Sequence, residues 1–166
     1  MDPVAAMSPG AFRKLASGER DLACEVFGSA LGLDRIWIFA LPLWPRAFVT
    51  GGRLVVWPAA FALRDFSTAP LAVQAAFIHE LVHVWQAQCG INLLWAKLRA
   101  GDRLESYDYA LSESLRMADF NIEQQAMIVE HGFLAARGQT TPFESLAYSA
   151  VLADWQGSIW IKPQQI

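Results

Sequence analysis

Short apolar runs in the first third of the chain predict strands. Residues 36–41 are rich in β-branched and aromatic side chains, which favour a strand. Two more apolar runs, residues 47–50 and 53–57, flank Gly51 and Gly52. Both glycines can adopt positive φ, so this pattern predicts a tight hairpin. We expect a small sheet that covers the helices, with one edge available to pair with an extended peptide.

Apolar residues at helical spacing predict a first helix between Ser17 and Gly28. Ser17 has a side chain suited to an N-cap, and Glu19 lies in the first turn, where the helix dipole favours an acid. Leu22 and Val26 belong to the apolar stripe of this helix, and Gly28 marks its end. We expect this helix to have a structural role.

The longest predicted helix covers residues 69–89. Ser67 and Thr68 are its candidate caps, Pro70 lies in its first turn, and Gly90 is its stop. It is apolar nearly all round until Gln86 and Gln88. A helix of that kind is buried, so we expect it at the centre of the domain.

The last third of the chain is predicted to be mainly helical. Asn121 and Gln124 have the spacing of a capping box, with Asp119 as the other candidate cap, and a Thr-Pro-Phe-Glu run at residues 141–144 combines a capping box with an early proline. The predicted segments are a helix at 93–100, a loop at 102–109, a short helix at 110–117, a helix after residue 121, a helix at 142–153 and a tail at 163–166.

A chain of 166 residues fits one domain with a sizeable core. Residues 1–14 contain Pro3, Pro9 and Gly10 and are predicted to form a flexible N-terminal arm. Residues 15–166 are predicted to form a single α+β domain, mainly helical, with the small sheet packed on the central helix.

Apolar residues make up 54% of the chain, and its mean hydropathy is positive. Either the core is unusually apolar or part of this surface meets a partner. The longest apolar stretch, residues 36–49, is interrupted by Pro42, Pro45 and Arg46, so we expect no membrane span. The net charge of −3 with dispersed Lys and Arg argues against nucleic acid as a partner.

The beginning of the sequence lacks the basic start and apolar core of a signal peptide. We therefore expect a cytoplasmic protein, or one exported by a secretion system that does not read such a signal. Cys24 and Cys89 lack metal-ligand spacing and are expected to be free buried thiols, with a disulfide between them as the alternative.

An H-E-x-x-H motif lies within the longest predicted helix. His79 and His83 are four residues apart, so they project from one helix face and can share a metal ion. Glu80 lies beside them and could take a proton from a metal-bound water, as in a zinc peptidase. The simpler interpretation is that two core histidines lie beside a glutamate without a metal ion. Burying them among apolar neighbours without a partner would cost several kcal/mol, which favours the metal site.

A catalytic zinc site has three protein ligands and one open position. Glu123 is the preferred third ligand because it lies in the first turn of a helix whose small Ala126 permits close approach to the motif helix. Glu130 shares its face two turns away and is an alternative ligand or an outer partner. His131 completes no H-E-x-x-H-x-x-G-x-x-H pattern and is the weaker alternative.

The sequence resembles zincin-type metallopeptidases of the glutamate-ligand group, and more narrowly the small bacterial Vgr-related metallopeptidases found with contractile injection systems. The resemblance covers most of residues 15–137 and implies a zincin-like fold, with His79, His83 and Glu123 as Zn²⁺ ligands and Glu80 as general base. It also implies a link to secretion machinery. The matching segments are residues 17–19, 26–28, 77–86, 107–109 and 119–126.

The resulting expectation is a zinc-dependent hydrolase of peptide or protein substrates. Tyr107 and Tyr109 are candidate donors to the oxyanion, because a phenol supplies one hydrogen bond. The alternative is a catalytically silent adaptor of a secretion system, in which the metal ion only stabilises the fold. A toxin that cleaves peptidoglycan amides or one host protein would use the same chemistry on another substrate.

Overall fold

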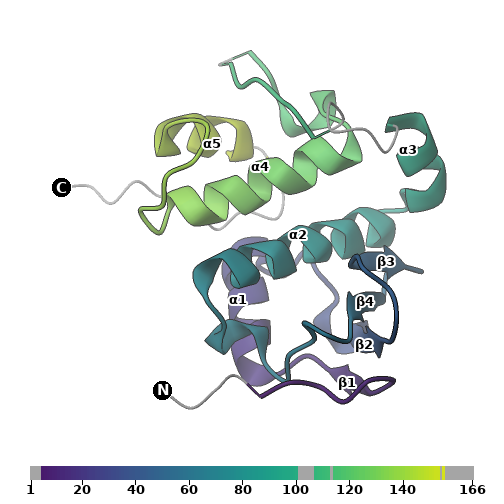
Figure 1. Ribbon diagram of the computed structural model, residues 1–166. Coiled ribbons are helices and arrows are strands. Elements are labelled where there is room, and N and C mark those ends of the chain that lie inside the picture. Colours follow the sequence, from purple (N-terminus) through teal and green to yellow (C-terminus); the bar gives the residue numbers. More distant parts are fainter. Residues whose placement is uncertain (1–4, 101–106, 113, 154, 156–166) are drawn as a thin grey trace.

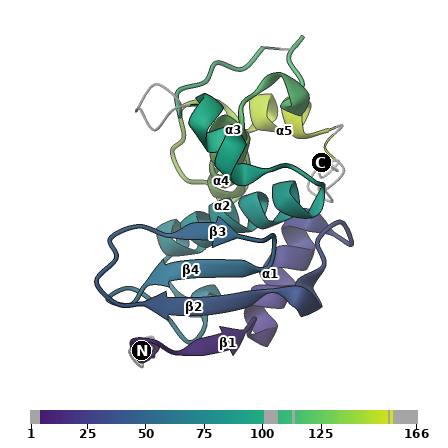
Figure 2. The same cartoon turned by 90° about the vertical axis from the view of Figure 1, so that its right-hand side faces the viewer.

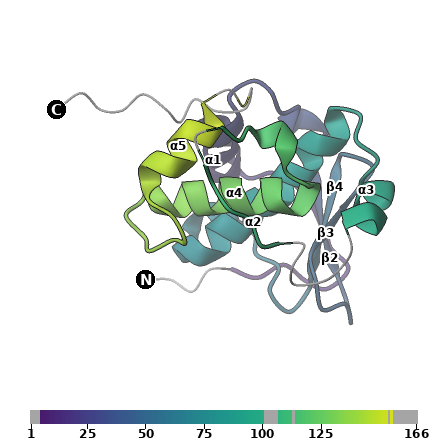
Figure 3. The same cartoon turned by 90° about the horizontal axis from the view of Figure 1, so that it is seen from above.

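The computed structural model describes residues 5–100, 107–112, 114–153 and 155. Helix α2 (Leu71–Gln88) lies between two groups of elements (Figures 1 and 2). The sheet and α1 (Ser17–Phe27) lie on one side, and α3 (Leu93–Ala100), α4 (Ile122–Ala135) and α5 (Ser145–Leu152) on the other. Seen from above, α4 crosses α2, with α3 and α5 near opposite ends of α4 (Figure 3). The predicted α+β class with a central motif helix is confirmed.

The sheet has four strands in the order β1-β2-β4-β3. They are β1 (Phe12–Lys14), β2 (Trp37–Leu41), β3 (Phe48–Thr50) and β4 (Leu54–Pro58). Strands β2 and β4 are parallel, and the two outer pairings are antiparallel. Gly51 and Gly52 have φ of 62° and 64°, as the hairpin between β3 and β4 requires. The predicted strand and hairpin are confirmed, and β3 is the edge strand nearest to α2 (Figure 2).

The described part of the predicted N-terminal arm is integrated into the fold. Residues 12–14 form β1 and pair with β2, Ala6 forms a bridge with Leu63, and Met7 is buried. The prediction of a loose arm is therefore wrong for these residues. It failed because the contacts that hold them come from distant residues, those of β2 and Leu63, which local composition does not reveal.

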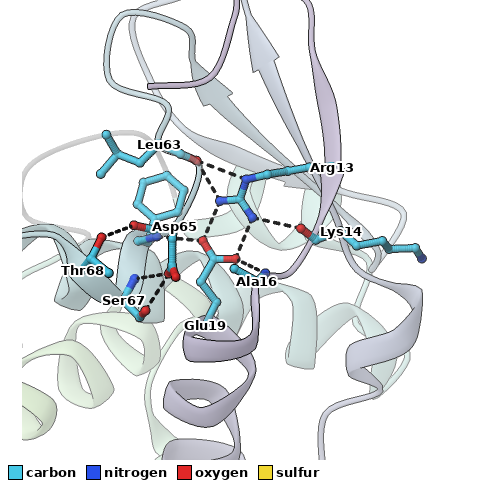
Figure 4. Close-up of polar contacts among 9 residues, drawn as sticks. Arg13, Lys14, Ala16, Glu19, Leu63, Asp65, Ser67 and Thr68 are labelled. Carbon is cyan, nitrogen blue, oxygen red and sulfur yellow. Dashed lines mark hydrogen bonds and ion pairs between the residues drawn. The ribbon is translucent and has the colours of Figure 1, made fainter. Parts of the chain in front are cut away.

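A buried ion pair anchors β1 to α1 (Figure 4). The Arg13 guanidinium donates to both oxygens of Glu19, at 2.7 and 2.5 Å, and to the carbonyl oxygen of Leu63. Glu19 also accepts from the backbone nitrogens of Ala16 and Phe66, each at 2.8 Å. Its side chain is completely buried, so it is the centre of a junction between β1, α1 and the segment before α2.

Three predicted helix boundaries need correction. Ala16, not Ser17, is the N-cap of α1, and Pro70 is the N-cap of α2 and not part of its first turn. Helix α5 begins at Ser145 and not at residue 142. The Thr141 hydroxyl donates to the carbonyl oxygen of Phe143, so it does not cap a helix there.

The described residues of segment 110–117 do not form the predicted short helix. Ser112 and Ser114 hydrogen-bond to each other at 3.1 Å, and such local side-chain bonds compete with helix formation. A 3₁₀ turn follows at Met117–Asp119. The predicted loop at 102–109 lies mainly outside the described residues, and the predicted tail at 163–166 lies entirely outside them.

The core is built on α2, whose Phe77, Ile78, Leu81 and Val82 are fully buried. Helix α4 packs against it, and Asn121 caps α4 by accepting from the backbone nitrogens of residues 123 and 124. That cap confirms the capping-box prediction. Within the described residues, no helix is both long and apolar enough to cross a membrane. Cys24 and Cys89 are free but exposed, so the prediction that they are buried is wrong.

Removing one partner of the buried ion pair tests its role in the fold. Glu19→Ala should lower the free energy of unfolding by about 3–5 kcal/mol, because it leaves the Arg13 charge without its carboxylate. Urea unfolding followed by circular dichroism measures the change. Asp34→Asn is the matched control, because the Arg20–Asp34 pair is exposed and its loss should change little. Equal stability of the Glu19 variant and the wild type would contradict this role.

Candidate metal centre between helices α2 and α4

Helix α2 presents His79 and His83 on the face that meets α4. The two residues are one turn apart, and their ring centroids are 5.0 Å apart. Both side chains are largely buried, with exposed fractions of 13% and 3%. The buried face of a helix is normally apolar, but here it carries two imidazoles. Buried polar groups of this kind need hydrogen-bond partners or a metal ion.

Glu123 in the first turn of α4 meets both imidazoles. Its Oε2 lies 3.3 Å from His83 Nε2 and 3.6 Å from His79 Nε2. One ligand atom from each of the three residues lies within 4.8 Å of the other two. Ala126, one turn further along α4, is fully buried, consistent with the predicted close approach of the helices. The structure thus brings the three predicted ligands together.

The two alternative third ligands lie elsewhere. Glu130 Oε2 contacts His79 Nδ1 at 2.9 Å, which is the nitrogen that faces away from Glu123. That contact makes it an outer partner that orients the ring. His131 Nδ1 is hydrogen-bonded to the Tyr109 hydroxyl, so this histidine does not join the cluster.

A chain of hydrogen-bonded glutamines selects the tautomer of His83. Gln125 Nε2 donates to the carbonyl oxygens of Met117 and Phe120, so its Oε1 is the atom that accepts from Gln86 Nε2 at 2.9 Å. Gln86 Oε1 must then accept from His83 Nδ1, at 2.8 Å. A neutral His83 with its proton on Nδ1 keeps the lone pair of Nε2 free to face Glu123. The backbone carbonyls therefore select the tautomer that a metal ion needs.

Polar atoms at the centre of this cluster lack hydrogen bonds within the described residues. They are Glu80 Oε2, His83 Nε2 and Glu123 Oε1, and all three are shielded from solvent. Buried polar atoms are nearly always satisfied. Glu123 Oε1 has the Lys97 ammonium 3.2 Å away, but Glu80 Oε2 and His83 Nε2 need another explanation. Two imidazoles and a carboxylate are a donor set that fits Zn²⁺, with a position left open. The residues present therefore fit the ion that the motif implies.

Burial and charge set the pKa values in the cluster. Burial would lower the pKa of His79, but its contacts with Glu123 and Glu130 raise it to about 9. Burial raises the pKa of Glu80, against the opposing effect of the two histidines. Burial also acts to raise the pKa of Glu123, yet the contacts with both histidines hold it below its ordinary value. Glu80 is thus a better proton acceptor than an exposed glutamate.

The two tyrosines proposed as donors have different positions. Tyr107 lines the cleft beside the cluster, together with Glu80 and Glu123. The Tyr109 hydroxyl instead bonds to His131 and to Tyr148, at 2.5 and 3.0 Å. Burial and the Tyr148 contact raise the pKa of Tyr109 well above its ordinary value. The position of Tyr109 does not support a role as oxyanion donor.

A cleft of about 410 Å³ gives access to the cluster. One wall is the edge strand β3 with the loop before it, and the other is α3. An adjoining cavity of about 550 Å³ is lined mainly by apolar side chains. It shares Phe48, His83, Leu94 and Lys97 with the cleft. Exposed Trp44 and Leu98 stand on opposite walls of the cleft.

Lys97, Gln86 and Gln125 are functional-site residues that the sequence reasoning missed. Lys97 Nζ lies 3.2 Å from Glu123 Oε1. Burial would lower the pKa of Lys97, but Glu123 raises it. No spacing rule links Lys97 to the motif. The polar positions Gln86 and Gln125 on otherwise apolar helix faces were the available signal for the glutamine chain.

Fold and site together define an α+β domain with a candidate metal centre on its central helix. The chain is 32% identical to the type VI secretion system spike protein VgrG2b of Pseudomonas aeruginosa, over 74% of this chain. The solved effector domain of VgrG2b superposes with a TM-score of 0.69 at 29% identity, covering 89% of this chain and 86% of that domain. These similarities show that the chain is homologous to the VgrG2b effector domain.

The chain spans only 13% of the length of the spike protein. No family model matches the sequence.

In the metal-free protein, His79 should stay protonated at pH values well above the ordinary pKa of a histidine. We expect an imidazole pKa of about 9 for His79, and a clear decrease in Glu130→Gln, because the variant removes one of the carboxylates that stabilise the cation. The chain has three histidines, so their NMR titrations can be assigned individually. The His131 signal is the internal control and should titrate below its ordinary value. A His79 pKa near 6.5 would contradict this account.

Proposed function

We propose that this protein is a zinc-dependent hydrolase of peptide bonds and acts as an effector delivered by a type VI secretion system. The observation that carries the proposal is the unsatisfied, buried Glu80 oxygen beside the His79, His83 and Glu123 cluster. A purely structural metal site needs ligands but no additional carboxylate of this kind.

His79, His83 and Glu123 would hold the ion through Nε2, Nε2 and Oε2. Zinc supplies Lewis acidity when bound, lowering the pKa of water and polarising a substrate carbonyl. Glu80 accepts the proton of the attacking water, because burial raises its affinity for a proton. It then returns this proton to the leaving amine nitrogen. Tyr107, on the cleft wall, is the remaining candidate for a hydrogen bond to the oxyanion.

The walls of the cleft favour an extended peptide as substrate. Strand β3 is the terminal strand of the described sheet and lines both the cleft and the adjoining cavity. Its free edge offers backbone hydrogen bonds to a peptide, as in β-strand addition. The apolar lining of the adjoining cavity would accept large apolar side chains beside the scissile bond.

The secretion link supports delivery outside the producing cell. The matching structure is that of an effector domain, and the matching part of VgrG2b is a small share of a much longer spike protein. We infer that this chain is the equivalent of that domain and leaves the cell with secretion machinery. The alternative expectation of a cytoplasmic protein remains a prediction.

Exposed apolar side chains favour a second candidate function, a silent adaptor that binds other proteins. Leu94, Trp95 and Leu98 of α3 are 66–70% exposed. A surface of this kind is typical of interaction sites. Leu94 and Leu98 also line the cleft, so a substrate accounts for them equally well. A toxin that cleaves peptidoglycan amides differs from the proposed peptidase in substrate alone.

Glu80→Gln separates the peptidase from the adaptor. The variant should keep its zinc but lose about 10²- to 10⁴-fold in kcat, because the amide cannot accept the proton. Mass spectrometry of a mixed peptide library measures cleavage, and elemental analysis measures zinc. Glu144→Gln is a control far from the cleft, at the exposed N-cap of α5. Wild-type protein that holds zinc and cleaves nothing in the library would favour the adaptor.

Ligand substitutions test the assignment of Glu123. Glu123→Ala should release zinc at concentrations that saturate the wild type. Glu130→Ala should weaken binding by only about 10- to 100-fold, as expected for an outer partner of a ligand. Competition with a chromophoric chelator gives both affinities, and His131→Ala should match the wild type. Full zinc retention by the Glu123 variant would exclude it as the third ligand.

A further inference from the structure

We propose that Lys97 is a positioning residue that keeps Glu123 a one-oxygen ligand and so preserves the open coordination position. This inference rests on the proposed zinc site. It assigns a role to a side chain of α3 that lies outside the H-E-x-x-H motif and outside the ligand set.

The two oxygens of Glu123 face different partners. Oε2 lies 3.3 and 3.6 Å from the Nε2 atoms of the two histidines. Oε1 instead has Lys97 Nζ 3.2 Å away, and the two groups form an ion pair. The lysine charge is therefore the one stabilising contact of Oε1 in this part of the structure.

Helix α3 delivers this ammonium group to the cluster. The Asn92 side chain accepts from the backbone nitrogen of Trp95 at the start of the helix, and α3 packs against α4, which bears Glu123. Leu94, Trp95 and Leu98 remain exposed, whereas Lys97 reaches inward to a carboxylate that is only 3% exposed. Lys97 itself is 47% exposed, so the pair adds little to stability. The contact of Lys97 with Glu123 is therefore better explained by a role in the metal site than by a role in folding.

Charge balance agrees with this arrangement. Glu80, Glu123 and Glu130 contribute three negative charges when ionised. A divalent cation and the Lys97 ammonium together neutralise them, provided that both imidazoles are neutral ligands. Without Lys97, the buried Oε1 would lack a positive partner other than the metal ion. The carboxylate would then turn both oxygens towards the ion and occupy the position that a catalytic site keeps open.

Lys97→Met tests the proposal in the full chain, because methionine keeps the length and apolar stem of the side chain. The first readout is the visible absorption of the Co²⁺-loaded protein, which weakens as the coordination number of cobalt rises. We expect the variant to retain Co²⁺ but to absorb more weakly than the wild type. Its kcat on a cleaved library peptide should fall about 10- to 100-fold. Lys97→Arg keeps the charge and should restore most of the spectrum.

Arg99→Met is the matched control, since Arg99 is an exposed cation on the same helix, and its spectrum should equal that of the wild type. A Lys97→Met protein with an unchanged Co²⁺ spectrum would overturn the inference while leaving the zinc site intact. Tighter metal binding with an unchanged spectrum would show that Lys97 competes with the ion, which also overturns it. Wild-type protein that binds no Co²⁺ and no zinc would instead refute the proposed function, and this inference with it.

Discussion

The burial of two imidazoles and a carboxylate between α2 and α4 is the constraint on which the rest of the structure depends. Glu123 and His83 are nearly inaccessible to solvent, and His79 is largely so. Groups of this kind are tolerated in a core only when their polar atoms have partners. Glu130 and Gln86 supply partners for the Nδ1 atoms of His79 and His83, and the Nε2 atoms of both rings face Glu123.

Hydrogen bonds around the His79, His83 and Glu123 cluster also hold α4 in place against α2. The cap at Asn121 fixes the first turn of α4, and therefore Glu123, opposite the motif. The chain from His83 through Gln86 and Gln125 ends on backbone carbonyls just before α4, so the same junction orients the helix and the ring. On the far side of α2, the buried Arg13–Glu19 pair joins β1 to α1. This pair holds the sheet whose edge strand β3 lines the cleft.

Local patterns predicted the parts of the molecule that local physics determines. Two consecutive glycines specified the hairpin, and helical spacing placed His79 and His83 on one face. The choice of Glu123 followed from its place in a capped first turn near a small residue. The failures have a common cause in contacts between distant residues. Glu19 lies in the first turn of α1 as predicted, but its contact with the backbone nitrogen of Phe66 could not be read from the sequence. Tyr109 is held by hydrogen bonds to His131 and Tyr148. Lys97 has no sequence signal because only the packing of α3 on α4 brings it to Glu123.

The chain is homologous to the VgrG2b effector domain over most of its length. The central claim is that the cluster holds one divalent cation. Anomalous diffraction at the zinc absorption edge, from crystals of protein purified without chelators, tests it most directly. The account predicts one strong peak about 2.0–2.2 Å from His79 Nε2, His83 Nε2 and Glu123 Oε2. A zinc-supplemented crystal without a peak at that point, or with Glu130 in place of Glu123, would contradict it.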